Sequence, residues 1–365
     1  MGRLTGIDTV LLLDLDGTLY VGSQVVPGAP ETVRWAREGE TPMATDNAIN
    51  SFTLDIDQLG WTGQDLHRPE SVVAEPDGTL WTSDGRGGVT RIDPDGGQTL
   101  LGGWGGEPNG LAIDPNGNLV TANIALGRVQ QMTRDGQIST VLEEVDGQRT
   151  TSANFVFYDR SGRLWLTCLT REDHWWPAVA HPRPDGFIVL VDDRGARIVA
   201  DGIYATNEAR LDAEERYLYV AETMKARILR FPVRSDGSLG EREVFGPDGL
   251  GLGGFVDGFT FDAEGNLWVT TVVRNGIGVL TRDGDWHVVL EDPREDVLAG
   301  FVDKLAAGAA TPEDMLAAAG PRLQFPTSVC FAGPDLRTAY VGSLAMSRLP
   351  TFRAPVPGLP MSHWS

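Results

Sequence analysis

Six oxygen-bearing side chains occur at equivalent places in six repeated segments of the sequence. Each segment has a polar residue, a short apolar run, a turn centred on Gly, Glu or Asp, and a second apolar run. Aligned on their turns, the segments place these residues eight positions earlier: Glu70, Asn109, Asn154, Asn207, Asp257 and Thr327. Carboxylate and amide oxygens suit calcium, magnesium or manganese, whereas zinc favours imidazole and thiolate. If the repeats face one axis, this register predicts a site for a hard divalent cation.

The elements that would position these side chains are short β-strands. In segments such as PESVVAEPDGTLWTSD and VDGFTFDAEGNLWVTT, two strand-like runs flank a Gly turn. The 45 glycines and 22 prolines also indicate an all-β protein. Successive turns lie roughly 40 to 70 residues apart, and periods near 40–50 residues are typical of four-stranded propeller blades. We therefore predict an all-β fold, a six-bladed β-propeller.

Two regions lie outside the regular repeat. A strand over 53–58 is expected to pair with the C-terminal blade around 336–354, which would close the ring without a long open edge. Between the fifth and sixth blades, an insertion at roughly 293–322 contains two predicted helices. The second helix has Thr311 as its N-cap, Pro312 in its first position and two acidic residues in its first turn.

Residues 1–48 have a different pattern, a short strand–helix extension with an apolar strand, a turn and a proline-initiated helix. The turn contains Asp14-Leu15-Asp16-Gly17-Thr18. This motif resembles the start of the haloacid dehalogenase superfamily of phosphatases, in which the first Asp is the nucleophile toward phosphate and the second an acid–base group. The lysine and the acidic pair of that family have no matching positions here. We predict a truncated, non-catalytic extension, followed by the propeller domain over 49–365.

The repeat region resembles the gluconolactonase, luciferin-regenerating enzyme and senescence-marker-protein family of six-bladed propellers. The resemblance covers about 50–365 and is carried by Pro69-Glu70, Asn154, Asn207, Val256-Asp257-Gly258 and the stretch FAGPDLRTAYVGS at 331–343. It implies that Glu70, Asn154, Asn207 and Asp257 bind one divalent cation at the channel mouth. Calcium is the metal that we expect, and magnesium, manganese and zinc stay open. The resemblance also implies that Asp257 is the general base or nucleophile.

Further residues are predicted to contact the substrate. Asn109 and Thr327 share the register but lie outside the implied ligand set, and we expect them to contact substrate or to orient a metal-bound water. The segment TREDHWWPAVAHPRPDG contains His174, Trp175 and Trp176, which would form an aromatic lid over the mouth. Two simpler interpretations remain: Asn and Asp before a strand commonly form turn hydrogen bonds, and this segment could pack on the blade edges.

Departures from the family pattern bear on the substrate. Sugar-lactone members usually have Arg two residues before the first ligand Asn and Asp directly after it, whereas this chain has Ser152 and Phe155 there. The second ligand Asn is usually followed by Gly-Leu, but here by Glu208-Ala209. These differences weaken the case for a polyhydroxylated aldonolactone, and an aromatic lid would favour a less polar ester, lactone or phosphotriester.

The sequence predicts a metal-dependent hydrolase of lactones or esters, with promiscuous phosphotriester hydrolysis as a further activity. A polarising cation at an open mouth does not distinguish strongly between carbonyl and phosphoryl groups. Two alternatives remain, since a fold alone implies no chemistry. The propeller could be a non-catalytic binding scaffold, or phosphatase activity could reside in the N-terminal segment. Motifs of the type G-x-S-x-G or H-E-x-x-H are absent from the sequence.

Composition narrows the classes of partner. A net charge of −21 argues against nucleic acid, because polyphosphate would be repelled.

Cys168 and Cys330 do not make a disulfide framework and are expected to be buried inside strands. Asp14 and Asp16 interrupt the N-terminal apolar run, and no stretch is long enough to span a membrane. We expect a cytoplasmic protein with a small-molecule substrate; the sequence does not indicate its oligomeric state.

Overall fold

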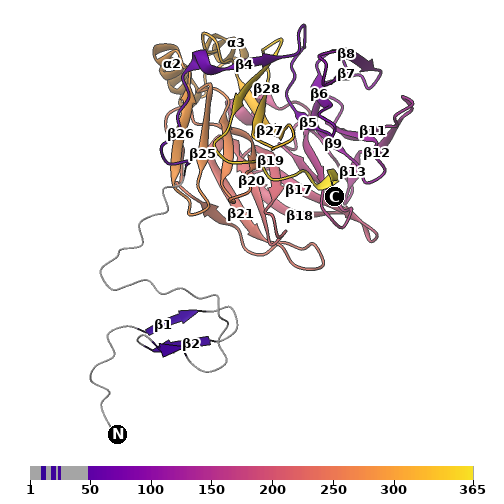
Figure 1. Ribbon diagram of the computed structural model, residues 1–365. Coiled ribbons are helices and arrows are strands. Elements are labelled where there is room, and N and C mark those ends of the chain that lie inside the picture. Colours follow the sequence, from indigo (N-terminus) through magenta and orange to yellow (C-terminus); the bar gives the residue numbers. More distant parts are fainter. Residues whose placement is uncertain (1–9, 14–17, 22–23, 26–47, 365) are drawn as a thin grey trace. The chain divides into compact units, whose positions relative to one another are not determined.

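The computed structural model describes residues 10–13, 18–21, 24–25 and 48–364 (Figure 1). The chain divides into two units, Met1–Asn47 and Ala48–Ser365. In the first, β1 (Val10–Leu13), β2 (Thr18–Val21) and β3 (Gln24–Val25) form an antiparallel sheet in that order. Asp14, Asp16 and the helix expected after them lie outside the described residues, so the phosphatase resemblance stays a prediction.

The second unit is a six-bladed β-propeller, as predicted, and each blade is a four-stranded antiparallel sheet. Blade 1 contains β5 (Val72–Ala74), β6 (Leu80–Asp84), β7 (Gly88–Ile92) and β8 (Gln98–Gly102). Blade 2 contains β9 (Pro108–Ile113), β10 (Leu119–Asn123), β11 (Arg128–Met132) and β12 (Ile138–Leu142). A hairpin of β13 (Glu144–Val145) and β14 (Gln148–Arg149) precedes blade 3. Blade 3 contains β15 (Ala153–Tyr158), β16 (Leu164–Cys168), β17 (Gly186–Asp192) and β18 (Gly195–Ile203).

The remaining blades follow the same order along the chain. Blade 4 contains β19 (Thr206–Leu211), β20 (Tyr217–Glu222), β21 (Arg227–Pro232) and β22 (Glu243–Phe245). Blade 5 contains β23 (Val256–Phe261), β24 (Leu267–Thr271), β25 (Gly276–Leu280) and β26 (Trp286–Glu291). Blade 6 contains β27 (Pro326–Ala332), β28 (Thr338–Ser343), β29 (Leu349–Arg353) and β4 (Gly60–Thr62). The first strand of each blade contacts the first strand of the next, from β5 through β27 and back to β5.

The ring closes with a strand from the N-terminal side of the propeller. β4 pairs antiparallel with β29, and Leu349 lies opposite Thr62. The prediction of a strand over 53–58 was wrong by a few residues. Asp55 caps a 3-10 helix over Ile56–Gln58 by accepting from Asp57 N at 2.9 Å, so the extended chain starts only after this turn.

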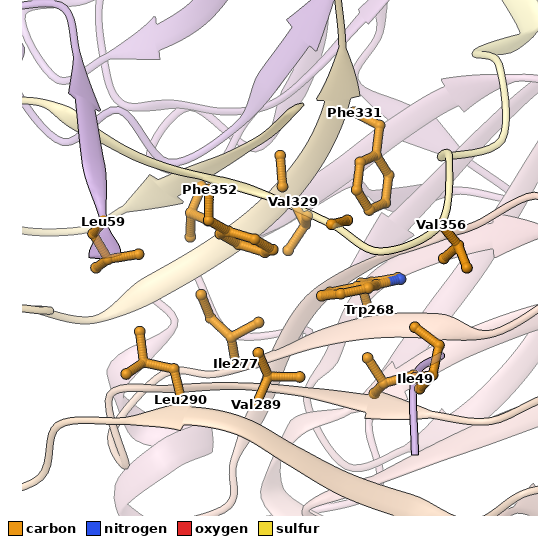
Figure 2. Close-up of a cluster of buried hydrophobic side chains, with 14 of the residues drawn as sticks. Ile49, Leu59, Trp268, Ile277, Val289, Leu290, Val329, Phe331, Phe352 and Val356 are labelled. Carbon is orange, nitrogen blue, oxygen red and sulfur yellow. The ribbon is translucent and has the colours of Figure 1, made fainter. Parts of the chain in front are cut away.

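The core consists of side chains packed between neighbouring blades. Figure 2 shows one such cluster, in which Ile277 and Val289 of blade 5 face Val329 and Phe331 of blade 6. Trp268 is fully buried among them and makes an edge contact with Phe331, at 5.7 Å between ring centroids. Such inter-blade burial is the main source of stability for a propeller, because a single blade cannot cover both of its apolar faces.

The helical insertion between blades 5 and 6 is confirmed. α2 spans Glu295–Ala306 and α3 spans Pro312–Ala317, and Thr311 caps α3 with Pro312 at its N-terminus. Both helices pack through a cluster that includes Phe301, Met315 and Phe325. A shorter helix, α1 (Trp176–Ala180), lies in the β16–β17 connection, and its Trp176 packs against the same cluster.

Two further expectations concern burial and the membrane. Cys168 in β16 and Cys330 in β27 are both buried and unbonded, which confirms their predicted place inside strands. Of the helices in the described part of the chain, none has the length and apolar character needed to cross a bilayer.

Candidate metal centre

A β-bulge near the start of the innermost strand displaces the predicted oxygen-bearing residue in five blades. Each is the second residue of its strand: Asn109, Asn154, Asn207, Asp257 and Thr327. Pairing with the second strand shifts register at each of these positions. A bulge removes a residue from the regular alternation of a strand and re-aims its side chain. The bulges therefore explain how one register can present side chains at one end of the ring.

Hydroxyl groups on the second strands satisfy backbone groups that the bulges leave outside the ladder. Phe155 N donates to Thr167 Oγ1 at 3.1 Å, and Gly258 N donates to Thr270 Oγ1 at 3.1 Å. Buried backbone groups without partners are costly, so these hydroxyls stabilise the bulged conformation. The Ser and Thr residues in the middle of these strands are a signal for the bulges that sequence reasoning did not use.

A cavity of about 270 Å³ lies at this end of the ring. Its polar lining includes Arg68, Glu70, Asn109, Asn154, Asn207 and Asp257. Its apolar lining includes Ile124, Leu169, Trp175, Val272, Met315 and Phe325. The structure thus brings together five of the six residues of the predicted register. An enclosure with mostly apolar walls and a few converging polar groups is typical of a small-molecule site.

Asn109 links two charged side chains at the edge of this polar cluster. Its Nδ2 donates to Glu70 Oε1 at 2.8 Å and to the Asn154 carbonyl at 3.0 Å. Its Oδ1 accepts from Arg68 Nη2 at 2.7 Å. Both ends of the amide are therefore used within the protein, which makes Asn109 a residue that orients Glu70.

Three buried oxygens of the cluster have no hydrogen-bond partner among the described residues. They are Glu70 Oε2, Asn154 Oδ1 and Asn207 Oδ1. Asn207 uses its Nδ2 to donate to Thr223 Oγ1 at 3.2 Å, and this leaves its oxygen free. Glu70 is 6% exposed, Asn154 3% and Asn207 5%, so water does not readily compensate these oxygens. Buried polar atoms normally find partners, and unpaired acceptors in one cavity are an arrangement that a cation would satisfy.

Burial and repulsion between neighbouring carboxylates raise the pKa values of the buried acids at this site. Burial raises the pKa of Asp257 to about 8, with the charge of Glu208 adding to the effect and the Arg68 guanidinium opposing it. Burial also raises the pKa of Glu70 well above its usual range, and Arg68 again opposes the shift. Burial raises the pKa of Glu208 to about 7 against the opposing charge of Arg210. The cluster therefore disfavours several negative charges at once unless a further positive charge is present.

The donor set fits a hard divalent cation. Two carboxylates would balance a charge of +2, and two amide oxygens would add neutral hard ligands. Residues 48–364 and the three short N-terminal strands contain no group of three or more His, Cys, Asp or Glu side chains with metal-binding geometry. The candidate is therefore the mixed carboxylate–amide set, whose hard oxygens suit calcium, magnesium or manganese.

Three predicted substrate contacts lie outside the cavity lining. Thr327 is buried, and its Oγ1 donates to the Glu70 carbonyl at 2.6 Å, so it fixes the backbone that carries Glu70. His174 is exposed and accepts from Trp176 N at 3.1 Å. Trp176 packs against the cluster that includes Phe301, Met315 and Phe325, and among His174, Trp175 and Trp176 the cavity is lined by Trp175 alone.

Sequence reasoning missed several residues at the mouth. Arg68 lies two positions before Glu70 and lines the cavity. Glu208 follows Asn207 and is 3% exposed, with Arg210 Nη2 3.3 Å from its Oε2. Met315 of α3 also lines the cavity, although the insertion had no predicted role there. Local pattern gave no signal for these contacts, apart from the presence of Arg68 beside a predicted ligand.

A second, smaller cavity of about 110 Å³ lies at the opposite ends of the innermost strands. Its lining includes Tyr158, Arg210, Asp212 and Phe261, together with Met361 of the C-terminal segment. Because residues of the candidate metal centre stand at the starts of the same strands, the two cavities occupy opposite mouths of the channel.

Comparison with known proteins was made at the level of sequence and of fold. Residues 69–298 match the family model described as the SMP-30/Gluconolactonase/LRE-like region. A 6-deoxy-6-sulfogluconolactonase from Pseudomonas putida is 25% identical over 191 residues, which cover 52% of this chain and 53% of that protein. A diisopropyl-fluorophosphatase from Loligo vulgaris is 27% identical over 195 residues, covering 50% of this chain and 60% of that protein. The chain thus spans little more than half the length of these curated relatives.

The solved structure of regucalcin, a calcium-binding protein from Agrobacterium tumefaciens, has the same fold. It superposes with a TM-score of 0.62 at 18% identity and covers 85% of this chain and 97% of that chain. At this identity the similarity concerns the propeller architecture alone.

Proposed function

The chain belongs to the SMP-30/Gluconolactonase/LRE-like family, and we propose from this premise that it is a hydrolase of lactones or esters that uses a divalent cation. One observation carries the proposal. Three buried oxygens from three different blades, which have no partner in the described part of the chain, belong to residues that line one cavity together with Asp257. The lactonase named among its relatives supports the same class of reaction.

Glu70, Asn154, Asn207 and Asp257 are the residues that would hold the ion. When bound, a cation of this kind polarises a carbonyl oxygen and favours addition of a nucleophile at the carbonyl carbon. Calcium is the metal we propose, because it accepts mixed carboxylate and amide oxygens without strict geometry. Asn109 donates to the Glu70 carboxylate and Thr327 donates to the Glu70 carbonyl, so these two residues would position Glu70 without binding the ion themselves.

Asp257 is the proposed catalytic group. As a general base, its carboxylate accepts a proton from the attacking water and returns it to the leaving alkoxide. As a nucleophile, it forms an acyl–enzyme anhydride with loss of the alkoxide, and water then releases the acid. Both routes need an ionised carboxylate. Burial raises the pKa of Asp257 to about 8, and the positive charge of Arg68 opposes that rise and favours the ionised form.

The cavity walls support a substrate with an apolar body. Leu169, Trp175, Val272 and Phe325 face the same space as the candidate ligands, so an acyl chain or ring would be buried beside the reacting carbonyl. Met315 of α3 adds to these apolar walls. This lining agrees with the expectation of a less polar substrate than an aldonolactone.

A substrate panel with controlled metal content tests the proposal. We expect hydrolysis of a lactone or an aryl ester that is lost on chelation and restored by added calcium, magnesium or manganese. Glu70→Gln should weaken cation binding, while Asp283→Asn, at an exposed carboxylate, should leave it unchanged. Turnover that survives complete chelation would contradict the metal role; a cation-binding but inert protein would favour the binding scaffold.

Phosphotriester hydrolysis is a second candidate activity at the same site. The diisopropyl-fluorophosphatase among the relatives is the observation that favours it. A phosphoryl oxygen presents the same hard electron pair to a cation as a carbonyl oxygen does. This activity should fall together with ester hydrolysis in Asp257→Asn. Phosphate-monoester turnover that survives Asp257→Asn but is lost in Asp14→Ala would instead place chemistry in the N-terminal segment.

A further inference from the structure

Arg68 is a cation with an unused donor inside the cavity. Its Nη2 donates to Asn109 Oδ1 at 2.7 Å, whereas its Nη1 is buried and has no hydrogen-bond partner among the described residues. The guanidinium group is planar and charged at all relevant pH values, and its donors suit a carboxylate or another oxyanion. A buried N–H of such a group without an acceptor indicates a place for an acceptor that the protein does not supply.

The backbone directs Arg68 toward the cavity. Arg68 has a φ of 46°, and its carbonyl accepts from Glu70 N at 2.8 Å. The residues two positions before Asn154, Asn207 and Thr327 share this left-handed conformation; they are Ser152, Ala205 and Phe325, with φ of 48°, 59° and 45°. Arg68, Ala205 and Phe325 all line the cavity. This repeated register thus supplies wall residues beside the candidate ligands, and blade 1 places an arginine in it.

The surroundings of Arg68 leave its charge uncompensated once the site holds a divalent cation. Arg68 is the only basic residue among the described residues that line the cavity, and Glu70 and Asp257 are the only acidic ones. These two carboxylates would balance the charge of the cation. The third buried acid, Glu208, already has Arg210 as its partner. The remaining positive charge therefore favours a ligand that carries one negative charge.

We propose that Arg68 is a specificity-determining residue that binds an anionic oxygen group, such as a carboxylate or sulfonate, on a substrate whose body is otherwise apolar. The juxtaposition of Arg68 Nη1, which has no hydrogen-bond partner among the described residues, with the apolar side chains of Leu169, Val272 and Phe325 carries the inference. It deepens the proposed function, on which it rests, by naming the substrate class. The other residues of this left-handed register, Ser152, Ala205 and Phe325, are uncharged, so Arg68 on blade 1 supplies its positive charge.

A binding experiment tests Arg68 without requiring turnover. Calorimetry on the calcium-loaded protein compares octanoate with octanamide, which share the apolar chain and differ in charge. We expect octanoate to bind more tightly, and Arg68→Gln to remove about 10- to 100-fold of its affinity while leaving octanamide unchanged, since a charge-assisted hydrogen bond is lost. Arg68→Lys should retain part of the preference, and Arg282→Gln, at an exposed arginine, should retain all of it.

The outcomes separate Arg68 from the hydrolase proposal. Equal binding of octanoate and octanamide by the wild-type protein would overturn the inference even if Arg68→Gln fails to fold. An octanoate preference that persists in Arg68→Gln would place the anion on the cation instead and would also overturn it. The kinetic experiment compares two substrates: the mono-aryl ester of a dicarboxylic acid, which keeps one free carboxylate, and the same aryl ester with that carboxylate methylated. We expect Arg68→Gln to raise KM only for the ester that carries the free carboxylate. Equal losses in kcat for both esters would assign Arg68 to the reacting carbonyl and reject the specificity role. An inert wild-type protein that still prefers octanoate would refute the hydrolase but not the anion site.

Discussion

Asn109 donates from Nδ2 to Glu70 Oε1 at 2.8 Å, and Glu70 Oε2 is buried with no partner among the residues that the structure describes. One carboxylate oxygen is thereby fixed by the protein and the other is presented to the cavity. The same amide accepts from Arg68, so the Asn109 side chain fixes the positions of one acidic and one positively charged residue. This relationship connects the candidate cation site with the proposed anion site.

Asn109→Ala should weaken cation binding by about 10- to 100-fold, the usual effect of removing a partner that orients a metal ligand. Glu70 would lose the donor that fixes its Oε1, and Arg68 would lose its acceptor. Titration of the metal-free protein with calcium measures the change. Asn116→Ala, at a turn on the same blade, serves as a control. Unchanged affinity in Asn109→Ala would show that Glu70 needs no orienting partner.

Asp257→Asn should lower ester or lactone turnover by about 10²- to 10⁴-fold, because it removes the proposed base or nucleophile but keeps the shape of the side chain. Calcium affinity measured in parallel separates loss of chemistry from loss of the ion. Single turnover of the wild-type protein in ¹⁸O-labelled water then tests the nucleophilic route: label in the Asp257 carboxylate indicates an anhydride that water opened at the Asp257 carbon, whereas label confined to the product means that water attacked the acyl carbon. Near wild-type turnover in the variant would remove Asp257 from the mechanism.

Gly258→Ala should destabilise the protein by about 1–3 kcal/mol, as overpacking in a core does. A Cβ at this bulge would collide with the Thr327 carbonyl and the Glu208 carboxylate, on the two neighbouring blades. The displaced bulge would also move Asp257. Chemical denaturation measures the free energy of unfolding. Gly300→Ala is the matched control, since α2 leaves open space there and alanine favours a helix by about 0.5–1 kcal/mol.

His363 should make stability depend on pH at the end of the channel away from the candidate metal centre. Its Nε2 lies 2.8 Å from the Ala74 carbonyl, and burial lowers the pKa of His363. A lowered folded-state pKa means that the stabilisation is present above the unfolded pKa of about 6.5 and is lost as the pH falls through the folded value. Denaturation at about pH 7.5 and about pH 5.5 should therefore show a smaller loss in His363→Gln, which keeps a donor but does not titrate. Equal losses in both proteins would mean that His363 contributes nothing to the pH dependence.

Local pattern was sufficient to predict the architecture of the propeller. Six turns with strand-like runs on either side predicted six blades, and Thr311 and Pro312 predicted the N-terminus of α3. These features depend on residues within a few positions of one another. The closing strand was misplaced because the capped turn at Asp55 competes with an extended conformation over the same residues.

The sequence by itself determined which residues of the repeats carry oxygens and that they share one register, because turn chemistry and strand alternation act over short distances. Only the tertiary structure decided which of those oxygens stay free. The Thr327 hydroxyl donates to the Glu70 carbonyl, 257 positions away in the sequence. The Asn109 amide bonds to Glu70 and Arg68, which are 39 and 41 positions away. Each of these pairings joins neighbouring blades: packing of blade 2 on blade 1 creates those of Asn109, and ring closure creates that of Thr327. Tertiary packing also brings Arg68 and the insertion helix α3 to the cavity, and their spacing in the sequence did not predict that position.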